Sequence, residues 1–311
     1  MARGLRLAVS YAYVERPNTR RNLSFFLRHG LDSSVALLSI VVKIGRPSDH
    51  AGDGGGSGCG FSLDIPKEHR ERVRVTVAEN TGYDMESHRR NALLFATLEE
   101  EEAQRQRETE TEDGGDPLFT HFVAMNDSAM GPFCRGDPAA RAAEGAAEEE
   151  EVDEEEPGPG PWHRLFAERL TRLRSHPPSS FVATIRHFSY FLFFSIDGWR
   201  AFATELRRRA LTSYRDAADV EVWLGRQPHD SMCASARHWD CPHTPWDVVF
   251  VKENRVGCKK TDTAGTSDRL CDVTPEELEA AVGRVETGRD GAKGRQHCDG
   301  RSGVGFIGSR G

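Results

Sequence analysis

The sequence lacks the patterns that most directly indicate a membrane protein. None of its apolar runs approaches the roughly 20 residues needed to cross a bilayer, so we predict no membrane span in this chain. The run at residues 7–14 is too short for the hydrophobic region of a signal peptide and is more typical of a buried strand. With neither signal present, a secretory or Golgi lumen and the cytoplasm both remain open as compartments.

Cysteine pairs and phosphate loops are also missing. The seven cysteines are scattered and none forms a C-x-x-C pair, which argues against a scaffold built on disulfides alone, although one or two bridges remain compatible with it. The Gly-rich segment at residues 52–60 lacks the G-x-x-x-x-G-K-[ST] pattern of a phosphate-binding loop. We therefore interpret this segment as a flexible insertion.

The sequence has no basic stripe of the kind that binds nucleic acid. The net charge is −8, but nine acidic residues lie within residues 144–156, and removing them changes the net charge to +1. Short basic clusters such as Arg207, Arg208 and Arg209 would fan around a helix and face solvent. Nucleic acid is therefore not an expected partner.

Buried apolar runs separated by helical patterns indicate the fold class. Strands are predicted at residues 7–14, 37–42, 73–77 and 118–125, as neighbours in one sheet. Buried strands that alternate with helices favour an α/β fold, with a mostly parallel sheet and helices on both faces. Ligands of such sheets bind at the carboxyl ends of the strands. A site is therefore expected in the turns that follow the strands.

Other elements follow from periodicity and turn chemistry. A short helix is predicted to begin at Thr274, with Pro275 at its first position and Glu277 completing a capping box. Helices are predicted at residues 19–29, 85–98, 162–173 and 199–211, a charged loop at 99–116, one core strand at 181–196 and another strand at 246–251.

Composition divides the chain into four segments. Residues 1–138 hold the first four strands, and residues 162–256 form the second half of the same domain. Between them, residues 139–161 are an acidic low-complexity segment, which we predict to be disordered because like charges repel and little can be buried. Residues 257–311 are a Gly-rich tail that we predict to be mostly disordered.

Four segments carry motifs that occur in the same order in one family. They are YVERPNTRRNLSFFLRHG at 13–30, ENTGYD at 79–84, MNDSAMGPF at 125–133 and HTPWDVVFVKENR at 243–255. In these motifs the chain resembles the fungal and algal glycosyltransferase-like proteins related to the rhamnan-synthesis F proteins. Met130 and Asp247 stand where that family has Arg and Glu. The resemblance implies a GT-A-like fold, with a nucleotide-sugar-binding half at 1–138 and an acceptor-side half at 162–256.

The third motif contains the turn Asn126-Asp127-Ser128. The resemblance implies that this turn corresponds to the D-x-D turn with which GT-A enzymes hold a divalent cation, Mg²⁺ or Mn²⁺. Asp127 is its only carboxylate and is the predicted metal ligand; one carboxylate with substrate phosphates is an established way to bind Mg²⁺. The alternative is a structural Asx or Ser turn that precedes Gly131 and Pro132.

Polar residues at the strand ends are predicted to contact the donor. The resemblance assigns this role to Glu15 after the first strand, to Asn80 and Asp84 after the third, and to Asn126 after the fourth. Asp84 would accept a hydrogen bond from a ribose hydroxyl, as acidic residues do after strands in nucleotide-binding folds. The alternative is that Asp84 caps the helix that follows it.

The acceptor side needs a general base to take the proton of the acceptor hydroxyl. Glu221 resembles the carboxylate that has this role in inverting GT-A enzymes, and its alternative is an exposed carboxylate on an amphipathic helix. Asp197 and Asp247 are predicted to lie on the acceptor side, and Asp197 is equally compatible with a helix N-cap.

Two functions therefore follow as expectations. The first is a glycosyltransferase-like protein that moves a sugar from a nucleotide-sugar donor to a glycan acceptor. The second is a non-catalytic or degraded relative that keeps the fold as a binding module. The donor sugar, its nucleotide, the acceptor and the stereochemical outcome are not indicated by any pattern in the chain.

Overall fold

The computed structural model describes residues 5–44, 63–81, 83–108, 117–132, 162–173, 181–183, 191–231, 250–252 and 275–287. The predicted insertion at 52–60, the acidic segment at 139–161 and most of the tail at 257–311 lie outside these residues.

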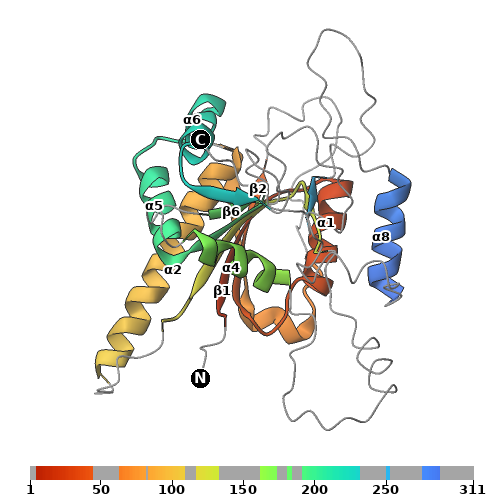
Figure 1. Cartoon of the computed structure of the whole chain (residues 1–311), viewed down its shortest axis with the longest axis horizontal. Coiled ribbons are helices and arrows are strands. Elements are labelled where there is room, and N and C mark those ends of the chain that lie inside the picture. Colours follow the sequence, from red (N-terminus) through yellow and green to blue (C-terminus); the bar gives the residue numbers. More distant parts are fainter. Residues whose placement is uncertain are drawn as a thin grey trace, which may run out of the picture.

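Seven strands form one mixed sheet in the middle of the molecule, and four of them are those predicted first (Figure 1). β1 (Leu7–Val14), β2 (Val35–Ile44), β3 (Val73–Glu79) and β4 (His121–Asn126) pair in parallel in the order β3-β2-β1-β4. The prediction that they are neighbours in one sheet is confirmed. β1 and β2 are almost continuously apolar because helices cover both of their faces.

Strands from the second half of the chain complete the sheet. β7 (Phe191–Ser195) pairs antiparallel with β4 and with β6 (Phe181–Ala183), and β6 pairs in parallel with β8 (His229–Ser231). The prediction of one strand over residues 181–196 is wrong. Hydrophobicity marks which residues are buried but not where the chain reverses, so two antiparallel strands give the same signal as one.

A second, two-stranded sheet brings two of the motif segments together. β5 (Ala129–Met130) pairs antiparallel with β9 (Val251–Lys252). β9 overlaps the end of the strand predicted at 246–251, of which residues 246–249 lie outside the described part. Phe250, just before β9, stacks on Phe191 with ring centroids 4.1 Å apart. The ends of the third and fourth motifs are therefore neighbours in the fold.

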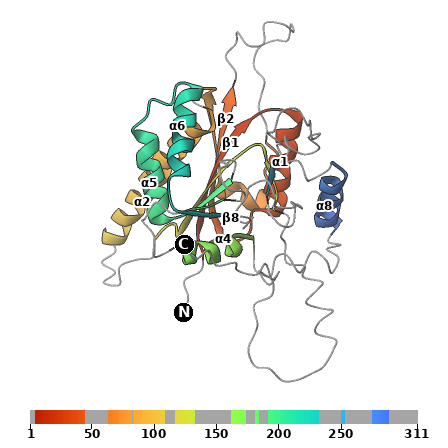
Figure 2. The same cartoon turned by 45° about the horizontal axis from the view of Figure 1, so that its top comes forward.

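Helices cover both faces of the sheet (Figures 1 and 2). On one face lie α1 (Pro17–His29) and α4 (Trp162–Arg172), and α8 (Pro275–Thr287) lies beyond α1; apolar side chains of these helices join one core cluster with Val9 and Ile40 of the sheet. On the other face lie α2 (Tyr83–Glu108), α5 (Ile196–Arg207) and α6 (Tyr214–Gly225), which share a second cluster with Phe122 and Phe194. A short 3-10 helix, η2 (Lys67–Arg72), precedes β3.

α2 is longer than the sequence pattern indicated. It was predicted to end at residue 98, with a loop at 99–116, but it continues without interruption to Glu108. Residues 99–108 consist of strong helix formers, and Glu102 pairs with Arg105 and Gln106 within one turn. The loop prediction is wrong for these residues, because the exposed side of a helix has the same charged composition as a loop. Among the described residues, no helix combines the length and hydrophobicity that a membrane span needs.

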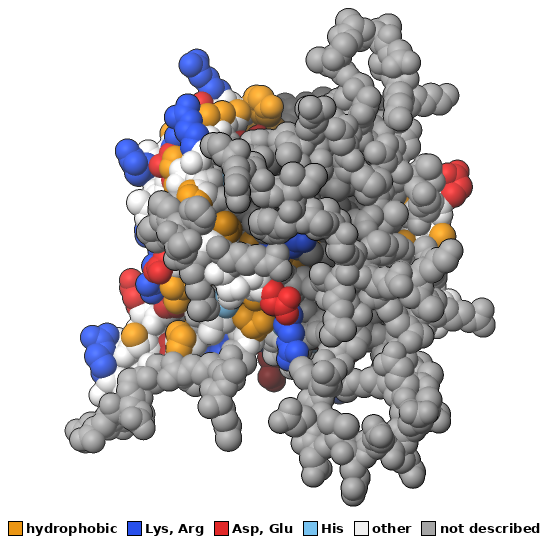
Figure 3. Space-filling model, in the orientation of Figure 1, with side chains coloured by type: hydrophobic (Ala, Val, Ile, Leu, Met, Phe, Trp, Pro, Cys, Tyr) orange, Lys and Arg blue, Asp and Glu red, His pale blue; other side chains and the backbone are white. Residues whose placement is uncertain are grey.

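Charged side chains on the α5–α6 side of the molecule are paired. Arg208 and Arg209 both form ion pairs with the nearly buried Glu205. Over the described part of the face in Figure 3, basic and acidic side chains are interspersed.

Buried polar side chains connect α2 to the sheet. Ser10 Oγ and His88 Nδ1 lie 2.8 Å apart, and Asn91 Nδ2 donates to Ser10 Oγ at 2.9 Å. Ser39 Oγ donates to Asn91 Oδ1 at 2.7 Å. These four side chains are at most 2% exposed. Because a buried polar group without its partner is costly, this network holds α2 in one position on β1 and β2, and so positions its N-terminus.

Candidate functional site

The carboxyl ends of β1 and β4 lie side by side at the point where the strand order reverses. From β1 the sheet continues through β2 to β3 on one side, and β4 lies on the other side of β1. The connections that leave the two strands at such a switch point go to opposite sides, which makes it the preferred ligand position in open α/β sheets. Asp127 follows β4 directly and occupies this position.

The side chain of Asp127 ties these strand ends together. Its Oδ2 accepts a hydrogen bond from the backbone N–H of Val14 at 2.8 Å. Its backbone carbonyl accepts one from Nδ2 of Asn22, in α1, at 2.8 Å. Asp127 therefore stabilises the junction of β1, α1 and β4, whatever else it binds.

The carboxyl group of Asp127 carries a poorly compensated charge. Burial raises its pKa to about 6 and the neighbouring carboxylate of Asp84 adds to this rise, whereas the Val14 N–H and Arg16 act in the opposite direction. A bound cation would stabilise the ionised form. Asp127 offers one carboxylate here, and its Oδ2 already accepts from Val14, so a divalent cation at this corner would have to take most of its ligands from substrate phosphates.

Asn126 joins the turn after β4 to the start of α2. Its Nδ2 donates to Asp84 Oδ2 at 2.9 Å. Its Oδ1 accepts from the backbone N–H and the Oγ of Ser128, at 3.2 and 2.6 Å. Asn126 is thereby held in one orientation, and it brings Asp84 and Asp127 into one neighbourhood although they come from different turns.

Glu15 lies at the end of β1 and is partly exposed. Its Oε1 pairs with Arg20 Nε at 2.6 Å, and its Oε2 accepts from the hydroxyl of Tyr13 at 2.5 Å. Burial, followed by the hydrogen bond to Glu15, raises the pKa of Tyr13. The tyrosine hydroxyl therefore remains a hydrogen-bond donor to Glu15 at any physiological pH.

Lys43, near the end of β2, belongs to this edge although the sequence analysis did not identify it. It is 4% exposed, and its Nζ donates to the backbone carbonyl of Thr81. Burial lowers its pKa to about 8, partly offset by the carboxylate of Glu86. Lys43 thus anchors the turn that carries Asn80 and Asp84. In the sequence, the one sign of Lys43 is that it is a charged residue within an apolar strand, and this alone does not predict a role.

The predicted residues separate into two groups in the structure. Asp197 lies in the first turn of α5 after β7, which runs antiparallel to β4 so that Ser195 pairs with His121 at the start of β4. Asp197 is therefore at the opposite edge of the sheet, where its 64%-exposed side chain lies 3.8 Å from Arg200. The residues found at the carboxyl edge are Glu15, Asn80, Asp84, Asn126 and Asp127.

Two predicted residues remain. Glu221 is exposed on α6, the helix that packs beside α2 through Ala217, Val220 and Leu224. Asp247 lies outside the described residues. In the part of the chain that the structure describes, no three or more His, Cys, Asp or Glu side chains form a group that could hold a metal ion by themselves.

Comparisons with known proteins add no family to this description. No protein-family model matches the chain. No curated protein matches it either. The functional interpretation therefore depends on the motifs and on the geometry of this edge.

Proposed function

We propose that the chain is a GT-A-like glycosyltransferase, which binds a nucleotide-sugar donor at the carboxyl edge of the parallel strands and transfers the sugar to a glycan acceptor. The proposal depends on one observation. Asn126 holds Asp84 beside Asp127, where the strand order reverses. The two turns that meet there are those whose motifs resemble the donor-binding turns of the glycosyltransferase-like family.

The chemistry of a nucleotide-sugar donor explains this arrangement. In this proposal Asp84 accepts a hydrogen bond from a ribose hydroxyl, in addition to those from Met85 N–H and Asn126 Nδ2, in the manner of acidic residues after strands in nucleotide folds. Asp127 is the residue that would hold a divalent cation. Such a cation, when bound, neutralises the negative charge of the leaving diphosphate.

Glu221 is the general base in this proposal. α6 begins at Tyr214, whose ring contacts Tyr83 at the start of α2, so the helix starts beside the donor edge. Glu221 is seven residues further along, which corresponds to about 10 Å of helix. A general base must lie within hydrogen-bond reach of the hydroxyl that attacks the anomeric carbon, so this role requires α6 to bring Glu221 over the donor when the acceptor binds.

The second candidate is a non-catalytic binding module on the same fold. Two observations favour it: Asp127 already has a structural partner in Val14, and Asp197 lies at the opposite edge of the sheet. On this alternative the chain binds a nucleotide sugar but neither hydrolyses nor transfers it.

Donor hydrolysis distinguishes the two candidates. Release of nucleoside diphosphate is measured for a panel of nucleotide sugars, with and without Mn²⁺. The enzyme proposal predicts Mn²⁺-dependent release from at least one donor. Asp127→Asn should lower it roughly 100-fold, the usual loss when one electrostatic contact to a leaving group is removed. Asparagine still accepts the hydrogen bond from Val14, so the turn is retained.

Asp197→Asn is the matched control, since it removes a carboxylate from the opposite edge and should leave hydrolysis unchanged. Glu221→Gln should lower transfer to an acceptor while leaving donor binding intact. If the wild-type chain binds a donor without releasing diphosphate under any condition, the binding-module alternative is the correct one. Equal losses in the Asp127 and Asp197 variants would contradict the placement of the site.

A further inference from the structure

Two exposed tyrosines from distant parts of the chain meet beside Asp84. Tyr83 is the first residue of α2 and Tyr214 is the first residue of α6. Their ring centroids are 5.4 Å apart and their planes lie at 75°. Tyr83 is 53% exposed and Tyr214 is 67% exposed. Such exposed rings add little to the packing of α6, which uses its buried apolar face for that purpose.

The backbone around the pair is held in an unusual conformation. Tyr83 has a φ of 53° and Leu211, three residues before Tyr214, has a φ of 50°. Bulky side chains rarely adopt this left-handed region, and they persist there only where the surrounding structure imposes it, often at functional sites. Leu211 is 1% exposed, so core packing holds it in place. Tyr83, by contrast, keeps its ring in solvent.

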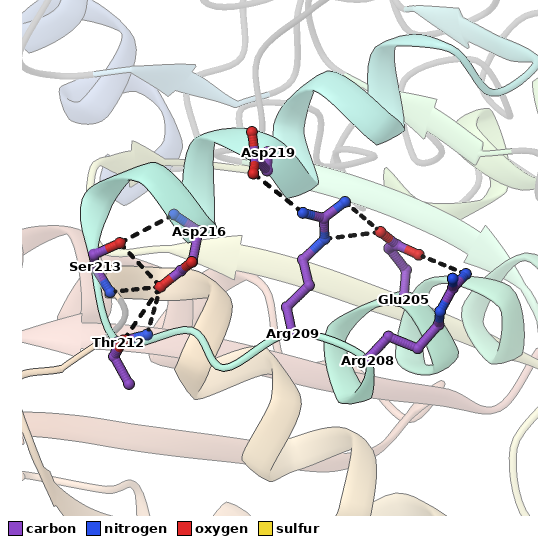
Figure 4. A network of polar contacts seen from close by, with 7 residues as sticks. All are labelled: Glu205, Arg208, Arg209, Thr212, Ser213, Asp216 and Asp219. Atoms are coloured by element: carbon purple, nitrogen blue, oxygen red, sulfur yellow. Dashed lines mark hydrogen bonds and ion pairs between the residues drawn. The ribbon is translucent and has the colours of Figure 1, made fainter.

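A polar network fixes the chain that leads into α6 (Figure 4). Ser213 and Asp216 form a capping box at the start of the helix, in which Asp216 Oδ2 accepts from the Ser213 N–H at 2.9 Å. Arg209 connects α5 to α6, with ion pairs to Glu205 at 2.6 Å and to Asp219 at 3.3 Å. The backbone at the first residue of α6 is thus positioned independently of its contact with α2.

We propose that Tyr83 and Tyr214 form a stacking surface for the heterocyclic base of the donor nucleotide. This inference rests on the proposed function, because it places the base at the same edge as the donor site. Tyrosine stacks on the flat face of any nucleobase. In an edge-to-face pair, the ring that contributes its edge has both faces free of its partner. A base stacked there would place its ribose near Asp84, the residue adjacent to Tyr83.

The order of the residues along the edge gives the donor one direction. The tyrosine pair lies at the starts of α2 and α6, whereas Asp127 lies at the ends of β1 and β4. Asp84 lies between the tyrosine pair and Asp127. It follows Tyr83 in the sequence, and it accepts a hydrogen bond from Asn126, the residue before Asp127. Base, ribose and diphosphate would therefore run from the start of α2 and α6 towards the ends of β1 and β4.

Binding of sugar-free nucleotides tests the stacking surface directly. Affinities for UDP, GDP and inorganic pyrophosphate are measured by titration calorimetry in the presence of Mn²⁺, with the full chain. Tyr83→Ala and Tyr214→Ala should each weaken binding of the nucleoside diphosphates about tenfold or more, as loss of one stacking side chain does. Tyr214→Phe should stay within twofold of wild type, because it keeps the ring. Pyrophosphate binding should be unchanged in all three variants.

Val222→Ala is the matched control, because Val222 is an apolar residue of α6 that is 53% exposed. Thermal unfolding confirms that each variant is folded. The inference is overturned if both alanine variants bind UDP and GDP like wild type, if Tyr214→Phe loses as much as Tyr214→Ala, or if the wild type binds neither nucleotide. Hydrolysis of nucleotide sugars that is insensitive to both alanine variants would overturn the stacking surface and leave the proposed function standing. If nucleotide binding needs both tyrosines but no nucleotide sugar is hydrolysed, the stacking surface stands and the enzyme proposal is overturned.

Discussion

Asp127 meets two conflicting requirements. The fold uses its side chain as a hydrogen-bond acceptor, and the proposed site needs the same side chain as a charged group. Its pKa of about 6 in the folded protein lies above the ordinary value of 3.8, chiefly because the carboxyl group is buried. The folded state therefore binds this proton more tightly than the unfolded state does. Protonation of Asp127 therefore stabilises the folded protein. This stabilisation is fully present below about pH 4 and is lost as the pH rises through about 6.

This conflict gives a prediction for stability. Asp127→Asn should raise the free energy of unfolding at pH 7.5 by on the order of 1–3 kcal/mol, because the neutral amide keeps the bond from Val14 without the cost of burying a charge. Near pH 4 the gain should vanish. Urea denaturation at several pH values measures this difference. Asp197→Asn, at an exposed position, should show no such pH dependence, and a variant that is less stable than wild type at every pH would contradict the assignment.

His88 acts in the opposite direction over the same pH range. Burial lowers its pKa to about 4, so the unfolded state takes up its proton first as the pH falls. Its contribution to stability is therefore full above about pH 6.5 and is lost towards pH 4. The wild-type profile combines both groups, which is why the comparison with the Asp127 variant is needed to isolate one of them.

At the scale of the element, the end of α1 requires glycine because there is no room for a side chain, and not because the backbone is strained. Gly30 has an ordinary φ of −99°, but a Cβ at this position would lie only 2.5 Å from Cε2 of Phe26. Phe26 cannot easily yield, because its ring also packs against Tyr11, Trp162 and Phe250. The requirement for glycine therefore follows from the core beneath α1.

Two glycine substitutions test this account as a matched pair. Gly30→Ala should lower the free energy of unfolding by about 1–3 kcal/mol, because it overpacks a filled core. Gly283→Ala should raise it by about 0.5–1 kcal/mol, because Gly283 is inside α8 with no atom within 4 Å of the added methyl group. Urea denaturation at neutral pH compares both with wild type. The same sign for both variants would contradict the steric explanation.

At the scale of the whole molecule, α8 closes the core on the α1 face. Leu278, Ala281, Val282 and Val285 are buried in the same cluster as α1 and β1. Two ion pairs at the rim of this contact connect α1 to α8: Arg21 with Glu279 at 2.6 Å and Arg28 with Glu286 at 3.0 Å. Exposed pairs of this kind contribute little energy, so the apolar contact is what holds α8 in place.

Leu278→Ala should therefore destabilise the entire protein. We expect a loss of about 2–5 kcal/mol, as for other large-to-small changes in a core, with a single transition that is followed equally by circular dichroism and tryptophan fluorescence. Glu276→Ala, at an exposed position on the same helix, is the control and should change little. If Leu278→Ala leaves the main transition in place, α8 is an accessory to the core and not part of it.

Much of the framework could be predicted because its causes are local. The four parallel strands follow from apolar runs, and a helix beginning with Pro275 was predicted from a turn signal, although Thr274 of the predicted capping box lies outside the described residues. Two predictions failed where the same composition fits two structures. Residues 181–196 contain a chain reversal that hydrophobicity does not record, and residues 99–108 are a solvated helix that charge alone does not separate from a loop.

The sequence by itself determined which polar groups follow the strands, since strand ends and turn residues are read from neighbours along the chain. Only the tertiary structure decided which of them meet. The antiparallel direction of β7 sends Asp197 to the opposite edge, and Asn126 reaches across 42 positions to Asp84. The burial of Lys43 and the meeting of Tyr83 with Tyr214 likewise depend on how distant segments pack. Such contacts have no local pattern, because their energy comes from desolvation and packing that exist only once the sheet is assembled.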